Sequence, residues 1–168
     1  MAAINEVSVS ESDAEHQYLT FIMAGEEYGV DILAVQEIRG WEDSTFIPNA
    51  PAYIKGVINL RGTIVPIMDL RTRFGLEDVQ YSPLTVVTIL KFESDQGERV
   101  MGIVVDAVSD VYTISDDETR RTPELTEDKN SAFIKGLVNV DDKMIILLDV
   151  ESLLSFEQKT LTKLVAAQ

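Results

Sequence analysis

The sequence predicts a mainly β fold built from two related halves, and three observations support this. Apolar residues make up 45 % of the 168 residues, which is enough for a hydrophobic core. The apolar segments are short and are separated by Gly, Asn, Asp and Pro, a spacing typical of small barrels or a sandwich rather than helical bundles. One segment returns in the second half of the chain, which indicates an internal duplication.

The predicted elements follow this pattern along the chain. Residues 1–16 are polar and predict a flexible N-terminal tail. The C-terminal segment 157–168 has Leu161 and Leu164 at helical spacing and predicts a C-terminal helix or tail. Between them, segments rich in β-branched and aromatic residues predict strands at 18–23, 28–30, 85–90 and 100–105.

The duplication is visible as matched segments. Three pairs align: 28–38 with 101–111, 52–59 (AYIKGVIN) with 132–139 (AFIKGLVN), and 64–68 with 144–148. The unequal offsets place the extra residues of the second half within 116–130. The half-repeats therefore run from about 17 to 80 and from about 84 to 156.

Residues present in both halves are predicted to have structural roles. Gly56 and Gly136 suit a backbone with positive φ or a close approach of another segment. Asp69 and Asp149 each precede a short segment with helical character, which predicts an N-cap. Two hairpin turns are predicted, with these residues at their tips: Arg61-Gly62 and Asp141-Asp142.

Positions that differ between the halves are better functional candidates. Arg61 aligns with Asp141, and residues 37–41 (EIRGW) align with 110–114 (DVYTI). The single tryptophan, Trp41, lies in the first half. Since Arg and aromatic side chains are enriched at protein–protein contacts, these positions point to a surface that binds a partner.

Charge and hydropathy exclude several classes of partner. The formal charge of −15 and the pI near 4.3 argue against nucleic acid, because phosphate binding requires a basic face. No apolar run approaches the ~20 residues that span a bilayer, and residues 1–12 lack the features of a signal peptide. We therefore expect a cytoplasmic protein without membrane insertion.

Catalytic chemistry finds little support. The chain has no Cys and one His, His16, so thiolate nucleophiles and Cys- or His-rich metal sites are excluded. No Gly-rich phosphate loop is present. Acidic runs such as 116–118 have the pattern of an exposed face, although a paired-carboxylate glycosidase is the least excluded enzyme. We expect no cofactor. After a protein that binds other proteins, the second-ranked interpretation is a small-ligand-binding double barrel, and the third is an enzyme.

Five segments of the chain form a recognisable set: 27–32 (EYGVDI), 35–40 (VQEIRG), 51–62 (PAYIKGVINLRG), 64–71 (IVPIMDLR) and 102–111 (GIVVDAVSDV). Together they resemble the CheW family of bacterial chemotaxis coupling proteins. The resemblance covers residues 17–156, and the NLRG motif is its most specific part.

The resemblance implies two packed five-stranded SH3-like β-barrels and a non-catalytic adaptor. Such an adaptor joins the regulatory domain of the histidine kinase CheA to the cytoplasmic tips of chemoreceptors, and is recruited to membrane receptor arrays through these partners. The implied kinase-binding residues are Thr85 and Val86. The implied receptor-binding residues, around a groove, are Val35, Glu37, Ile38, Arg61 and Val111.

Each of these assignments has a purely structural alternative. Periodicity alone favours core packing for Val35 and Ile38, and one face of an ordinary strand for the Thr85-Val86 pair. Glu37 and Arg61 carry opposite charge and could form a surface ion pair worth only ~0–1 kcal/mol. Our hypothesis is that this pair forms and orients both side chains for a receptor helix.

Overall fold

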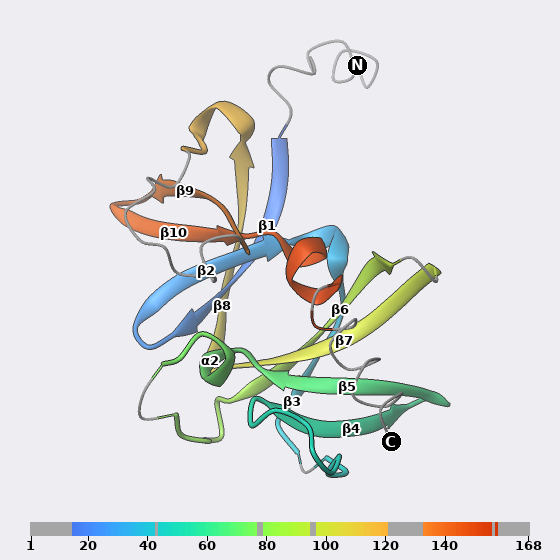
Figure 1. Cartoon of the computed structure of the whole chain (residues 1–168). Helices are drawn as coiled ribbons and strands as arrows, with labels where there is room; N and C mark the ends of the chain where they lie inside the picture. Colours follow the sequence, from blue (N-terminus) through green and yellow to red (C-terminus); the bar gives the residue numbers. More distant parts are fainter. Residues whose placement is uncertain are drawn as a thin grey trace.

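The computed structural model describes residues 15–42, 44–76, 79–94, 97–120, 133–155 and 157. Within them the chain forms two five-stranded sheets (Figure 1). The short helical elements are η2 (Ile32–Ala34), α2 (Leu70–Arg73) and η3 (Asp116–Glu118), and residues 150–155 are also helical. The strands are β1 (Glu15–Met23), β2 (Glu26–Asp31), β3 (Val35–Gly40), β4 (Ile54–Leu60), β5 (Thr63–Asp69), β6 (Val86–Ser94), β7 (Gly97–Val105), β8 (Ala107–Ser115), β9 (Ile134–Val140) and β10 (Lys143–Leu148).

The two sheets have the same strand order, as the duplication predicts. One sheet has the order β8-β1-β2-β10-β9 and the other β3-β6-β7-β5-β4. Replacing each strand by its counterpart five strands along the chain converts one order into the other. Each sheet therefore takes two strands from one half of the sequence and three from the other. The half-repeats are not separate barrels, because they exchange strands.

The register repeats as closely as the order. The parallel pair of β5 and β7 places Ile67 opposite Gly102, and the parallel pair of β10 and β2 places Leu147 opposite Gly29. A Cβ at Gly102 would lie 2.6 Å from Ile67 Cδ1, and one at Gly29 would lie 3.1 Å from Leu147 Cδ2. Glycine at both positions lets a large apolar side chain fill each barrel.

The predicted caps are confirmed in both halves. The Asp69 side chain accepts a hydrogen bond from the Arg71 N–H at 3.1 Å and caps α2. The Asp149 side chain accepts one from the Ser152 N–H, also at 3.1 Å, where residues 150–155 are helical. A carboxylate at this position satisfies a backbone donor that the helix leaves free.

The predicted turns and glycines are also confirmed. Consecutive residues with positive φ form both hairpin tips, Arg61-Gly62 and Asp141-Asp142, as two-residue hairpin turns require. Gly56 has a φ of 140°, and a Cβ there would lie 2.1 Å from the Thr45 carbonyl oxygen. At Gly136 the constraint is a close approach, with the Thr119 side chain 2.5 Å from a Cβ.

Three clusters of buried apolar side chains form among the described residues. One fills each barrel, around Ile67 and Val104 in one and around Ile145 and Leu147 in the other. The third and largest cluster contains residues of both sheets and joins the barrels, with members such as Phe21, Met68, Leu90 and Leu148. Its continuity makes the two barrels one packed unit.

Both predicted terminal segments lie mostly outside the described residues, as does most of the predicted insertion at 116–130. The described chain begins within the predicted tail, where Glu15 and His16 already pair with Ser115 and Ile114 of β8. At the other end, the carboxylate of Glu157 is fully buried and pairs with Arg73.

Candidate partner-binding surfaces

Strand β3 presents three of the predicted receptor-binding residues at the edge of its sheet. Val35 is half-buried and packs against the cluster between the barrels, as its structural alternative proposed. Glu37 is also half-buried, whereas the Ile38 side chain is 45 % exposed. A β-branched apolar side chain on an edge strand is available to a partner, so core packing does not account for Ile38.

The hypothesis that Glu37 pairs with Arg61 is confirmed. Arg61 lies at the tip of the β4–β5 hairpin, and its Nη2 donates to Glu37 Oε1 at 2.6 Å. The second carboxylate oxygen of Glu37 lies 3.9 Å from Arg39 Nε. Because the Arg61 side chain is 71 % exposed, the pair contributes only ~0–1 kcal/mol to stability and remains accessible to a partner.

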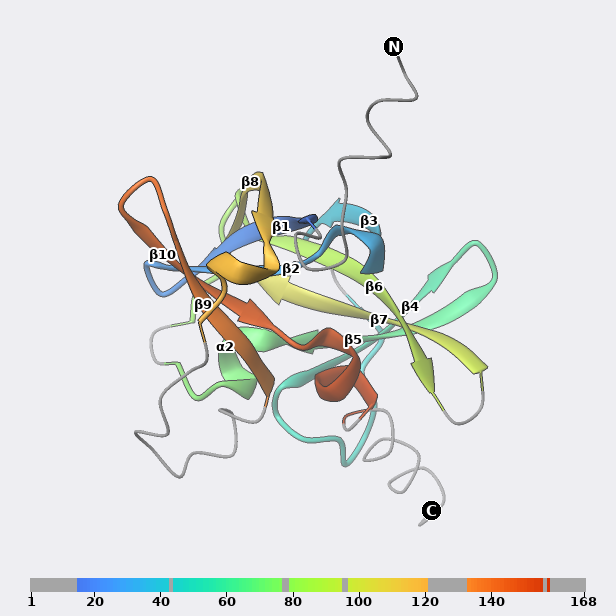
Figure 2. The same cartoon turned by 90° about the horizontal axis from the view of Figure 1, so that it is seen from above.

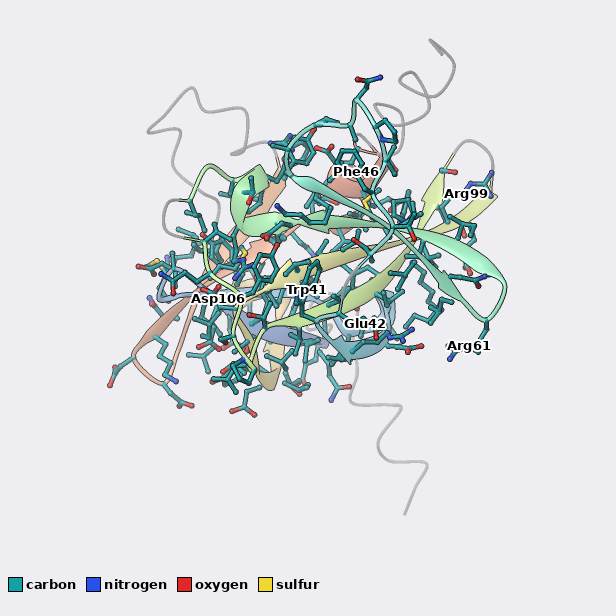
Figure 3. All side chains as sticks on the ribbon, turned by 90° about the horizontal axis from the view of Figure 1, so that it is seen from below. Trp41, Glu42, Phe46, Arg61, Arg99 and Asp106 are labelled. Atoms are coloured by element: carbon teal, nitrogen blue, oxygen red, sulfur yellow. The ribbon has the colours of Figure 1, made fainter. Side chains whose placement is uncertain are left out.

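A cleft of about 550 Å³ lies beside this ion pair. It is lined by β3, by the β4–β5 hairpin and by β7, with Gln36, Arg61 and Arg99 among its polar residues. Figure 2 shows the β4–β5 and β6–β7 hairpins projecting next to each other, and Figure 3 places Arg61 at the outer tip of the first. The cleft gives this end of the barrel a concave surface, with Arg61, Arg99 and Glu98 as its charged residues.

Val111 occupies the position of β8 that corresponds to Ile38 in β3. β8 is also an edge strand, in the other sheet, and Val111 is 48 % exposed. Each sheet therefore presents an exposed β-branched side chain at the same place on its edge. The structure thus brings Glu37 and Arg61 together on one barrel and leaves Val111 on the other.

The predicted kinase-binding residues lie where β6 begins. Thr85 is 2 % exposed, and its hydroxyl accepts a hydrogen bond from the Ser82 N–H at 2.9 Å. Val86 is half-buried against the cluster between the barrels. The preceding residue, Leu84, is 70 % exposed and is the apolar side chain that this segment presents to solvent. Leu84 was not predictable from strand periodicity, which says nothing about a residue before the strand.

A polar network around the buried pair of Asp69 and Arg71 holds the segment before β6 in place. The Arg71 side chain donates to both carboxylate oxygens of Asp69, to Asp106 Oδ1 at 2.7 Å and to the Gln80 carbonyl. The Tyr81 hydroxyl donates to Asp69 Oδ2 at 2.6 Å, and the Arg71 guanidinium lies over the Tyr81 ring. The network therefore connects α2 to residues 80 and 81, which precede Leu84 in the same segment.

Burial and hydrogen bonding compete over the charges of this network. Burial alone would raise the pKa of Asp69, but hydrogen bonds from Arg71 and Tyr81 hold it below its ordinary value of 3.8. Burial would likewise lower the pKa of Arg71, yet hydrogen bonds to Asp69 and Asp106 raise it. Burial and the bond to the Asp69 carboxylate both raise the pKa of Tyr81. The ion pair is therefore fully charged at neutral pH.

Other exposed apolar side chains were not predicted. Ile64 and Met144 lie at equivalent positions just after the two hairpin tips, and both are exposed. Phe46 and Leu33 are exposed in connecting segments. The exposed positions of Ile64 and Met144 could have been predicted from the sequence, because both halves keep an apolar residue beside a hairpin tip.

The described residues contain neither a metal site nor a helix that could span a membrane. No three His, Asp or Glu side chains gather there as ligands of a metal ion. The helices in the described part of the chain are too short and polar to cross a membrane.

The fold and these surfaces define a class of protein: a double β-barrel whose candidate sites are exposed apolar side chains and ion pairs suited to binding other proteins. The family model of the CheW-like domain matches residues 17–158. The chain therefore belongs to the CheW-like family.

Individual relatives agree with this assignment. The chemotaxis protein CheW of Klebsiella aerogenes is 47 % identical over 150 residues, covering 89 % of this chain and 88 % of that protein. The chemotaxis protein CheW of Rhizobium meliloti is 37 % identical over 143 residues, covering 85 % and 90 %. The crystal structure of the scaffolding protein TtCheW from Thermoanaerobacter tengcongensis superimposes with a TM-score of 0.73 at 34 % identity, covering 82 % of this chain and 91 % of that one. The protein is thus a chemotaxis scaffold of SH3-like barrel fold and not an enzyme.

Proposed function

We propose that this scaffold couples chemoreceptors to the histidine kinase CheA by binding both at once. The receptor partner is the cytoplasmic tip of a chemoreceptor, and the kinase partner is the regulatory domain of CheA. The protein itself is cytoplasmic and reaches the membrane array through these partners. The two docking surfaces lie on neighbouring strands, since Gly40 of β3 pairs with Val86 of β6, and the proposal requires that both can be occupied together.

The proposed receptor surface combines Val35, Glu37, Ile38 and Arg61 of one barrel with Val111 on the edge strand of the other. The exposed side chains of Ile38 and Val111 suit the apolar face of a receptor helix. The pair of Glu37 and Arg61 supplies opposite charges at a defined place beside that apolar surface. Such charges contribute to the orientation and specificity of docking more than to its affinity.

The kinase surface is the segment that enters β6. Leu84 provides the exposed apolar contact, while Thr85 and Val86 fix its position through buried contacts. The hydrogen-bond network of Asp69, Arg71 and Tyr81 fixes the same segment in place. In this proposal Thr85 acts by positioning the surface rather than by touching the kinase.

Signal transfer then requires no chemistry in this chain. Each surface would bury on the order of 800 Å² if it is of standard size, and less if the assembly uses weak repeated contacts. Weak contacts become effective in an array, because a tethered partner binds at high local concentration. Control of the kinase follows from different contacts in two signalling states.

The observation that carries this proposal is the ion pair of Glu37 and Arg61 beside Ile38, at positions that differ between the two halves of the chain. In a pull-down with a receptor cytoplasmic fragment, Arg61→Glu is expected to weaken binding at least about tenfold, which corresponds to ~1.4 kcal/mol. Lys143→Glu makes the same charge change on the equivalent hairpin of the other barrel and is expected to bind normally. If Arg61→Glu binds the fragment as the wild type does, the proposed receptor surface is wrong.

A further inference from the structure

The internal duplication allows two equivalent corners between the barrels to be compared. At the first corner, Arg71 is 2 % exposed and fills the space between Asp69 of β5 and Asp106, which precedes β8. The other carboxylate oxygen of Asp106 accepts a hydrogen bond from the Ala24 N–H in the β1–β2 turn, at 3.0 Å. A buried guanidinium thus closes this corner by binding the carboxylates of Asp69 and Asp106.

The second corner has no such closure. The internal alignment places Asp149 at the position of Asp69, Glu151 at that of Arg71 and Leu33 at that of Asp106. Glu151 is exposed, and the Leu33 side chain is 76 % exposed. In place of the buried arginine, a cleft of about 440 Å³ lies between the barrels.

The lining of this cleft is acidic around an apolar floor. Phe92, Leu148 and Val150 are buried members of the cluster between the barrels and form its apolar part. Acidic side chains outnumber basic ones, with Asp31, Glu93, Glu98, Asp149 and Glu151 against Lys91 and Lys135.

The charges of the cleft are not all neutralised from within. Lys135 is held by the Tyr18 hydroxyl, to which its Nζ donates at 2.9 Å. Asp31 and Asp149 accept hydrogen bonds from the Leu33 N–H and from Ser152. Among the described residues, the carboxylates of Glu93, Glu98 and Glu151 have no hydrogen bond or ion pair, so they remain available to a cation.

We propose that this cleft binds a partner segment that carries an arginine next to an apolar side chain. The guanidinium would lie among Glu93, Glu98 and Glu151, as that of Arg71 lies between carboxylates at the first corner. The neighbouring apolar side chain would cover Leu33. Arginine fits better than lysine, because its planar fork binds two carboxylates at once. The inference does not depend on receptor or kinase binding, and this cleft shares only Glu98 with the cleft beside Arg61.

A peptide titration on the free, full-length protein tests this site. The probe is an acetylated and amidated peptide with one arginine between two leucines, and its control replaces the arginine by neutral, similarly shaped citrulline. We expect saturable NMR shifts at Leu33, Glu93 and Glu151, with binding of the citrulline peptide at least about tenfold weaker. Shifts elsewhere only, no shifts, or equal binding of both peptides would overturn the proposal.

A variant that rebuilds the first corner provides a second test. Leu33→Asp combined with Glu151→Arg places an internal guanidinium in the cleft, and is expected to reduce arginine-peptide binding at least about tenfold. Asp141→Arg makes the same charge change as Glu151→Arg at a hairpin tip whose equivalent residue is Arg61, and should bind normally. Undiminished binding by a folded double variant contradicts the proposal, and the citrulline comparison decides the matter if that variant does not fold.

Discussion

Replacement of Arg71 by alanine is expected to be among the most destabilising single changes in this protein. The Asp69 carboxylate is fully buried, and Arg71 supplies its only neutralising charge among the described residues. Removing one partner of a buried ion pair costs about 3–5 kcal/mol, because the remaining charge stays desolvated. The equivalent residue Glu151 is exposed, so Glu151→Ala is expected to change stability by no more than about 0.5 kcal/mol.

Urea unfolding measured by tryptophan fluorescence gives these free energies. The single tryptophan, Trp41, is a suitable probe because its ring lies 4.6 Å from that of Tyr81, within the network. Asp69→Asn combined with Arg71→Met removes both charges and is expected to cost less than Arg71→Ala alone. A loss below about 1 kcal/mol for Arg71→Ala, or a double variant as unstable as the single one, would refute the reasoning.

The same ion pair predicts a pH dependence. Since the folded pKa of Asp69 is below its ordinary value of 3.8, its stabilising contribution is present above that pH and is lost as pH falls through the folded value. The difference in unfolding free energy between wild type and Arg71→Ala should therefore shrink below pH 3.8. A difference that stays constant across this range contradicts the assigned hydrogen bonding.

Three further predictions concern the strands and their edges. Gly56→Ala should lower the free energy of unfolding in urea by more than about 2 kcal/mol, because its Cβ would meet the Thr45 backbone. At Gly40 a Cβ would have open space, so Gly40→Ala should cost under about 1 kcal/mol, and equal effects of the two changes would contradict this reasoning. Ile38→Asp should leave the circular dichroism spectrum unchanged but abolish capture by a receptor fragment, and retained capture would remove Ile38 from the surface. Arg61→Glu should lower stability by less than about 1 kcal/mol, and a larger loss would show that its pair with Glu37 is structural.

Much of the fold could be predicted because the duplication makes each half a control for the other. Gly56, Gly136, Asp69 and Asp149 were assigned structural roles from their repetition, and the structure confirms these roles. The exchange of strands between the halves was not predictable in this way. An internal match shows which segments are equivalent, but both copies of a segment have the same pairing chemistry.

The candidate binding surfaces could be predicted from the sequence only in part. The pair of Glu37 and Arg61 could be inferred because the two residues carry opposite charge and lie at positions that differ between the two halves. Arg71 was overlooked because its neighbour Asp69 already had an explanation as a helix cap. The burial of Thr85 depends on the turn that places Ser82 beside it, which strand periodicity does not report.

The proposed function requires one chain to carry two docking surfaces that are occupied at the same time. Co-sedimentation of the purified protein with a receptor cytoplasmic fragment and with CheA, separately and then together, measures this. Each partner is expected to bind alone, and all three proteins are expected to sediment as one complex. Displacement of the kinase by the receptor fragment, or failure of either partner to bind alone, would show that the two surfaces are not as proposed.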